Sequence, residues 1–295
     1  MSFTSCSDSA MLAGLNDSNI GILSKLAIKA SRRGGEILMS HYGKIKNIEN
    51  KGRIGDLVTS ADLECEEEIV NYLRNQTPDI NILAEESGLS GIQDGLCWCI
   101  DPLDGTTNFA HGYPFFATSI GLTWKDLPIL GSICIPFINE TYWSSPIEGA
   151  FCNQSAIQVS TSNLLIDSLL VTGFSYDRFN IIDNNYAEFC WLTNKTRGVR
   201  RGGAAAVDLA FVASGRLDGY WEKGLSKWDL AAGIALVQMA GGVISDYPDG
   251  NFDLSKGRVL ATTPGIKEEL MSELSKVIPL DARSYGSSAI DSIGS

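Results

Sequence analysis

The chain has 295 residues, with 23 Lys and Arg against 35 Asp and Glu, and a net charge of −12 at pH 7. This charge argues against nucleic-acid binding, because basic side chains are needed to displace the counterions of a phosphate backbone. With 44% hydrophobic residues and no uninterrupted apolar stretch of about 18 residues, the sequence predicts a soluble globular protein without a membrane span.

The two ends of the chain predict flexible tails over residues 1–20 and 281–295. The first of these is rich in Ser, Asn and Asp and contains no basic residue, so neither a secretory signal nor an Arg-rich transit peptide is expected. Between the tails we expect one domain, 21–280, with halves at about 21–157 and 158–280.

The seven cysteines are scattered and odd in number, which predicts reduced thiols in a cytoplasm. Cys97 and Cys99 form the closest pair. We expect them to point to opposite faces of a strand and to be buried, not to bind zinc.

The first half of the chain predicts two helices followed by strands. Apolar residues at helical spacing indicate a helix over 22–42. A second helix is expected over 62–75, with its run of Glu side chains facing solvent. The strands are expected at 80–84, 96–100, 116–123, 129–135, 141–144 and 149–152.

After residue 159, strands and helices alternate. Strands are expected at 169–172, 198–201, 219–222, 242–245 and 259–262, and helices at 184–194, 205–214, 229–240 and 265–277. The pattern predicts layers of helices and sheets around a common core.

The most informative stretch is 101–109, Asp-Pro-Leu-Asp-Gly-Thr-Thr-Asn-Phe. Its two carboxylates lie where the strand 96–100 is expected to break into a turn, and they repel each other unless a cation lies between them. Mg²⁺ prefers such oxygen ligands and retains water positions for a phosphate substrate. The same composition also suits a plain turn, so the stretch alone leaves both interpretations open.

Three further acidic residues fit the same centre. Glu85 follows the strand 80–84, Asp62 begins the second helix, and Asp229 lies in the first turn of another helix. Each alone is explained as a cap or a surface charge. Together they place carboxylates at strand ends and helix starts, as in a multi-metal phosphate site.

Two stretches, 101–109 and 228–233, resemble the signatures of the inositol monophosphatase family, whose members are Mg²⁺-dependent, Li⁺-sensitive phosphomonoesterases. The resemblance runs in order from about residue 22 to 278 and is most like bacterial and plant-chloroplast members. It extends to segments 51–59, 85–87, 198–206 and 220–222. It implies an α+β fold, the αβαβα sandwich shared with fructose-1,6-bisphosphatase, and phosphatase activity.

The resemblance also implies two to three Mg²⁺ ions. Glu85, Asp101 and the main-chain carbonyl of Leu103 would hold the first ion. Asp101, Asp104 and Asp229 would hold the second, and a third would share Glu85 with waters. The half 21–157 would then be the metal-binding half, and 158–280 the substrate half.

Catalytic and substrate contacts are implied in the same way. Thr106 would hydrogen-bond an attacking water and be oriented by Asp62, with Glu85 as a further catalytic residue, and the N–H groups of Gly105 and Thr106 would cradle the phosphate. The remaining contacts would be made by Gly203, Ala204 and Ala205 through their N–H groups, by Glu222 to the substrate hydroxyls, and by Lys51, which would order the metal-site loop.

The expected substrate is a small phosphorylated polyol, inositol 1-phosphate, hydrolysed to inositol and phosphate. Animal members carry Thr where this chain has Ala204, so histidinol phosphate, fructose 1,6-bisphosphate and 3′-phosphoadenosine 5′-phosphate stay open. A non-catalytic scaffold predicts damaged metal ligands, and every acidic position and Thr106 is present. The resemblance further implies a cytoplasmic homodimer.

Overall fold

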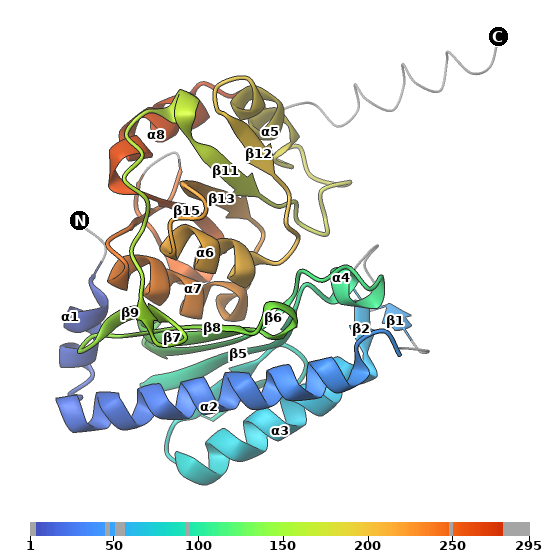
Figure 1. The fold of residues 1–295 in the computed structure, drawn as a ribbon, viewed down its shortest axis with the longest axis vertical. Helices are drawn as coiled ribbons and strands as arrows, with labels where there is room; N and C mark the ends of the chain where they lie inside the picture. The colour runs from blue at the N-terminus through green and yellow to red at the C-terminus, as the bar shows by residue number, and fades with distance from the viewer. Residues whose placement is uncertain (1–3, 45–47, 51–56, 92–94, 248–249, 280–295) are drawn as a thin grey trace.

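The computed structural model describes residues 4–44, 48–50, 57–91, 95–247 and 250–279. Within them, layers of helices and β-sheets alternate (Figure 1). This arrangement confirms the predicted α+β sandwich. No described helix has the length and apolarity that crossing a membrane requires.

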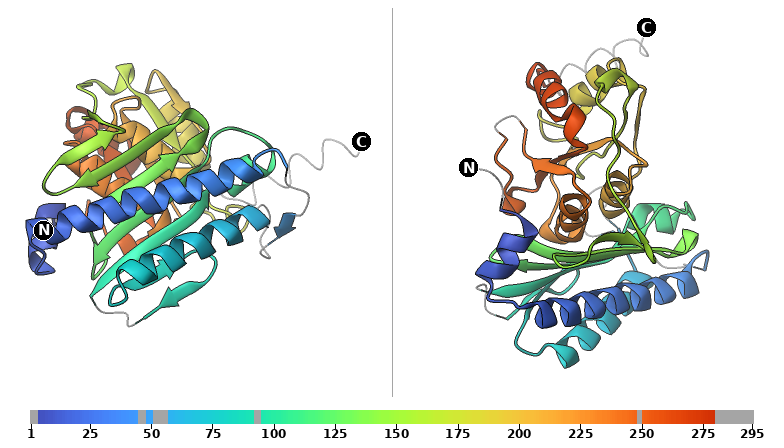
Figure 2. Two further views of the ribbon diagram at one scale, coloured as in Figure 1. Left: turned by 60° about the horizontal axis from the view of Figure 1, so that its bottom comes forward. Right: turned by 60° about the vertical axis from the view of Figure 1, so that its left-hand side comes forward.

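The outer layer consists of α2 (Asp17–His41) and α3 (Ser60–Gln76), which lie side by side beneath the first sheet (Figure 2). Asn16 and Thr59 cap these helices, and each accepts a backbone N–H from the first turn. The apolar side chains of both helices pack against the sheet and form one core cluster with it.

The first sheet has eight strands in the order β10-β9-β8-β7-β6-β5-β3-β4. β3 and β5 run parallel, so their C-terminal ends lie at the same edge of the sheet. The strands are β3 (Asn81–Ala84), β4 (Gly88–Ser90), β5 (Leu96–Asp104), β6 (Ala117–Trp124), β7 (Leu127–Ile135), β8 (Glu140–Ser145), β9 (Gly149–Cys152) and β10 (Ser155–Ala156).

The second sheet has five strands in the order β12-β11-β13-β15-β14. They are β11 (Leu169–Thr172), β12 (Gly198–Arg200), β13 (Gly219–Lys223), β14 (Val243–Ser245) and β15 (Arg258–Thr262). Helices α6 (Ala205–Ala213) and α7 (Lys227–Met239) lie between the two sheets, and α5 (Tyr186–Thr193) and α8 (Lys267–Ser275) lie beyond the second (Figure 1). A separate pair, β1 (Ile48–Asn50) and β2 (Leu57–Thr59), is antiparallel.

Small residues bring α7 directly onto the first sheet. Gly121 of β6 and Gly131 of β7 are partners in the ladder. A Cβ at Gly121 would lie 2.6 Å from the Cβ of Ala231, and one at Gly131 would lie 2.5 Å from the Cα of Ala232. Because larger side chains would push the helix away, these contacts fix the position of its first turn, which carries Asp229.

The N-terminal segment differs from the predicted flexible tail. Residues 6–12 form helix α1 (Cys6–Leu12), which is capped by Ser5 and contacts β7. Cys6 and Ala10 are buried, and the Cys6 thiol donates to Gln238 of α7 at 2.9 Å. Few and small apolar residues make this contact, so the composition of the segment gave no sign of it. The predicted tail 281–295 lies outside the described residues.

Candidate active site

Strand β5 continues through the acidic stretch instead of ending at Ile100 as predicted. It reaches Asp104, and its pairing with β6 shifts by one residue between Asp101 and Asp104. Pro102, which has no N–H to donate, lies in this bulge, and its carbonyl accepts the Thr118 hydroxyl at 3.1 Å. A bulge redirects the side chains of a strand, and here it brings both carboxylates into one buried cluster.

Four of the predicted acidic residues meet at this point. Burial, and then the charges of Glu85, Asp104 and Asp229, raise the pKa of Asp101 well above its usual value. Glu85 stands at the end of β3, where its N–H donates to the Ile100 carbonyl of β5 at 3.1 Å. In the described parts of the chain, no group of three or more His, Cys, Asp or Glu side chains is already arranged to hold a metal ion. Asp101 and Asp104 are buried, while Glu85 and Asp229 are partly exposed. Gathering four carboxylates at one place is unfavourable without a compensating cation.

Two helix N-termini orient two of these carboxylates. Asp104 accepts the N–H groups of Ala205 and Ala206, the first residues of α6, at 3.1 and 2.7 Å, while burial raises its pKa to about 7. Asp229 accepts the N–H of Ser226 at 2.7 Å in the capping box of α7. The N–H of Ala205, expected to face the substrate, is therefore already engaged by Asp104.

A short helix, α4 (Thr106–Ala110), follows the acidic stretch directly. It begins after Gly105, whose φ is 89°. A Cβ at Gly105 would lie 2.9 Å from the Phe115 carbonyl oxygen, so only glycine suits both the conformation and the space. The turn leaves the first N–H groups of α4 beside the carboxylate cluster.

Thr106 and Asp62 are joined beneath the cluster. The Thr106 hydroxyl lies 3.2 Å from Asp62 Oδ1 and 3.0 Å from the Leu103 carbonyl oxygen. The other oxygen of Asp62 accepts the N–H and the hydroxyl of Thr59 at 2.9 and 2.6 Å. Asp62 is fully buried. The structure thus brings together two predicted site residues that lie 44 residues apart in the sequence.

A cavity of about 200 Å³ opens beside these residues. Seven predicted residues line it, namely Asp104, Gly105, Gly203, Ala204, Ala205, Glu222 and Asp229. Burial raises the pKa of Glu222 to about 7, and the Tyr220 hydroxyl donates to it at 2.6 Å. Lys51, the remaining predicted residue, lies outside the described residues.

The comparisons with known proteins agree with this geometry. The sequence pattern of the inositol monophosphatase family matches residues 22–279. The inositol-1-monophosphatase of Synechocystis sp. is 51% identical over 251 residues, which cover 85% of this chain and 88% of that protein. The chain belongs to the inositol monophosphatase family. The protein is therefore a phosphomonoesterase.

Two further relatives of this phosphatase carry different functional names, one as an inositol monophosphatase and one as a Nus factor. The solved inositol monophosphatase of Anabaena (Nostoc) sp. superposes with a TM-score of 0.82 at 44% identity, covering 89% of this chain and 98% of that one. The Nus factor SuhB of Pseudomonas aeruginosa is 40% identical over 261 residues, covering 86% of this chain and 96% of that protein.

Glu66 is a site residue that the sequence analysis missed. It was placed on a solvent-facing Glu run of the second helix, yet it is buried. Its two carboxylate oxygens accept the N–H groups of Glu86 and Ser87, each at 2.8 Å. Glu66 lies one helical turn after Asp62, so in this family member one face of α3 supports both Thr106 and the segment that carries Glu85.

The far wall of the cavity was missed as well. It is formed by the segment after β11 and by two arginines, namely Gly173, Phe174, Ser175, Tyr176, Arg178 and Arg201. Gly173 packs so closely against the Glu222 carboxylate that a Cβ there would displace it. No acidic or glycine-rich motif marks this segment in the sequence.

Proposed function

We propose that the protein is a Mg²⁺-dependent phosphatase that hydrolyses inositol 1-phosphate to inositol and phosphate. The observation that carries this proposal is the cluster of four carboxylates, with Asp101 and Asp104 buried, beside a small cavity with Glu222 on its wall. A relative named inositol-1-monophosphatase at 51% identity supports the choice of substrate.

The donor set of the cluster fits a hard divalent cation. All its ligand atoms are oxygens, which Mg²⁺ prefers, and burial together with the charges of the neighbouring carboxylates raises the pKa of Asp101. Two to three ions would be held by Glu85, Asp101, the carbonyl of Leu103, Asp104 and Asp229. When bound, they would neutralise the phosphoryl oxygens and make a nearby water more acidic.

The chain's own residues would position the reactants. The hydroxyl proton of Thr106 points to Asp62 or to the Leu103 carbonyl, so the Thr106 oxygen is left to accept a hydrogen bond from the attacking water. The N–H groups of Gly105 and Thr106 at the start of α4 would bind the phosphate. Glu222, with the N–H groups of Gly203 and Ala204, would receive the polyol.

The substrate is tested by phosphate release with Mg²⁺, with and without millimolar Li⁺, from the four candidate esters named above. We expect preferential, Li⁺-sensitive hydrolysis of inositol 1-phosphate. Preference for another ester would overturn the substrate but keep the metal site. No turnover of any ester would favour the scaffold alternative. The SuhB relative is consistent with that alternative, because it is named as a Nus factor and not as a phosphatase.

Glu222→Gln is expected to lower kcat/KM for inositol 1-phosphate by about 10- to 100-fold, because a hydrogen bond to a charged group contributes about 1.5–3 kcal/mol. Hydrolysis of p-nitrophenyl phosphate, which has no polyol hydroxyls, should change little and serves as the control. An equal loss on both esters would place Glu222 outside the polyol contact.

Glu66→Gln is expected to weaken Mg²⁺ activation about tenfold, the lower end of what groups that hydrogen-bond and orient metal ligands contribute to metal affinity. The new NH₂ group cannot accept one of the two N–H groups that hold the segment of Glu85. The kcat at saturating Mg²⁺ should stay near that of the wild type. Glu67→Gln, at the neighbouring exposed position, is the matched control, and equal behaviour of the two variants would contradict the assignment.

We further propose a homodimer that works in the cytoplasm, as the family resemblance implies. Sedimentation velocity should then give twice the chain mass of 31.8 kDa. A single species at the chain mass would refute the dimer.

A further inference from the structure

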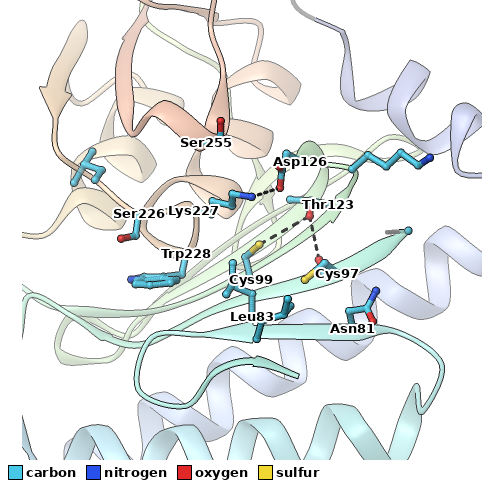
Figure 3. A pocket seen from close by; sticks show the side chains of 14 residues that line it. Asn81, Leu83, Cys97, Cys99, Thr123, Asp126, Ser226, Lys227, Trp228 and Ser255 are labelled. Atoms are coloured by element: carbon cyan, nitrogen blue, oxygen red, sulfur yellow. Dashed lines mark hydrogen bonds and ion pairs between the residues drawn. The ribbon is translucent and has the colours of Figure 1, made fainter. Parts of the chain in front are cut away.

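A second cavity, of about 400 Å³, lies beside the candidate active site and contains the thiols of Cys97 and Cys99 (Figure 3). The expectation that these cysteines point to opposite faces of the strand was wrong, because residues i and i+2 of a strand point to the same face. Leu225 lines both cavities, so they share a wall.

The two thiols are unequal in access but close to each other. Cys97 is partly exposed and Cys99 is buried. The neighbouring Cys99 side chain, against the effect of burial, lowers the pKa of the Cys97 thiol, which donates to the Trp98 carbonyl at 3.6 Å. Cys97 and burial raise the pKa of the Cys99 thiol well above its usual value. Thr123 lies 3.9 Å from the Cys99 sulfur and donates to the Cys97 carbonyl at 3.3 Å. Cys97 is thus the thiol that meets a reagent first, with Cys99 behind it as a second sulfur ligand.

The opposite wall of this cavity is the start of α7. Ser226, Lys227 and Trp228 line it, and they directly precede Asp229 of the carboxylate cluster. Lys227 is held by Asp126 of the β6–β7 turn at 2.6 Å, and Ser226 donates its N–H to Asp229 at 2.7 Å. A ligand bound to the two sulfurs would therefore contact the turn that orients Asp229.

We propose that Cys97 and Cys99 form a dithiol site for a thiophilic ion or metalloid, and that its occupation inhibits the phosphatase through the first turn of α7. Two sulfur side chains on one strand face suit soft acceptors, which bind sulfur in preference to oxygen. The inhibitory part of the proposal rests on the proposed role of Asp229 in the active site. The binding part does not.

Phenylarsine oxide is a suitable probe, because it is retained only where two sulfurs converge. Two As–S bonds form, the As–O bond breaks, and both thiol protons leave with the oxygen as water, so no oxidant or reductant is needed. Intact-mass spectrometry of the full chain would follow the adduct after washing with 2-mercaptoethanol, a monothiol, and then with 2,3-dimercaptopropanol, a dithiol. Phosphate release would be measured on the same samples.

We expect one adduct on the wild type that survives the monothiol, is removed by the dithiol, and lowers activity at least tenfold while it is bound. Cys97→Ser should lose both the adduct and the inhibition while keeping its basal activity. Cys190→Ser, at the exposed cysteine of α5, is the matched control and should behave like the wild type.

Three results would overturn the proposal. A monothiol-resistant adduct that persists in Cys97→Ser, or none on the wild type, would refute the dithiol site. A normal adduct with unchanged activity would refute its link to α7. If the protein hydrolyses no ester before the arsenical is added, the proposed function fails instead, and the mass measurement still decides the binding.

Discussion

Replacing Asp101 by Asn is expected to lower kcat by about 10³-fold or more, because charge stabilisation by a bound cation is worth several kcal/mol. Asp101 is the residue on which the charges of Glu85, Asp104 and Asp229 all act. Removing its charge weakens cation binding at the centre of the cluster. Phosphate release across a range of Mg²⁺ concentrations would measure the loss.

The fold should survive this substitution, because Asn has the shape of Asp and can still accept the Leu103 N–H that Asp101 accepts at 3.0 Å. The pKa of Asp101 is higher in the folded state than in the unfolded state. At pH values between these two pKa values the folded state binds more protons, so the free energy of unfolding falls as pH rises from the lower value to the higher. Without divalent cations, the melting temperature of Asp101→Asn should therefore fall less than that of the wild type as pH rises above about 4.

The matched control for Asp101→Asn is Asp167→Asn, a surface change at an exposed ion pair with Arg197. This variant should keep both its activity and its Mg²⁺-dependent rise in melting temperature. An Asp101→Asn enzyme with most of its activity would remove Asp101 from the metal site, and the assignments of Glu85, Asp104 and Asp229 would lose their common centre.

Local sequence signals predicted most elements of the fold, and the reasons for the failures are physical. Strands and helices with strong periodicity, such as β6 and α3, were found within a few residues of their observed bounds. β5 was cut short because Pro102 and Gly105 are read as a turn. The pairing with β6 overrides that signal through a bulge, which only the partner strand could reveal.

In the site, too, residues marked by a local motif were predicted, and a residue defined by its tertiary contacts was missed. The carboxylates were found because they stand at element ends, where motifs concentrate. Glu66 was missed because it lies in a run of Glu residues, of which Glu64 and Glu67 are in fact exposed. Charge alone does not distinguish a solvated Glu from one that binds backbone N–H groups. Its spacing of four residues from Asp62 was a helical signal that could have identified it.

Thr106→Val is expected to lower kcat by about 10²- to 10⁴-fold, the contribution typical of a positioned acid–base group, here the hydroxyl between the attacking water and Asp62. Valine has nearly the shape of threonine, so the change removes the hydroxyl from its place between Asp62 and the Leu103 carbonyl and little else. KM should change little, because the proposed phosphate contact is made by backbone N–H groups. Thr106→Ser restores the hydroxyl and should recover most of the activity.

A double-mutant cycle decides whether Asp62 acts through Thr106. If Asp62 only orients the threonine hydroxyl, Asp62→Asn lowers kcat in the wild type but adds little in the Thr106→Val background. Additive losses would mean that Asp62 reaches the reacting water independently. Melting temperatures of all four proteins separate this effect from the stability that Asp62 gives α3 by accepting the N–H and hydroxyl of Thr59. A structural role alone would lower the melting temperature and leave kcat of the folded enzyme unchanged.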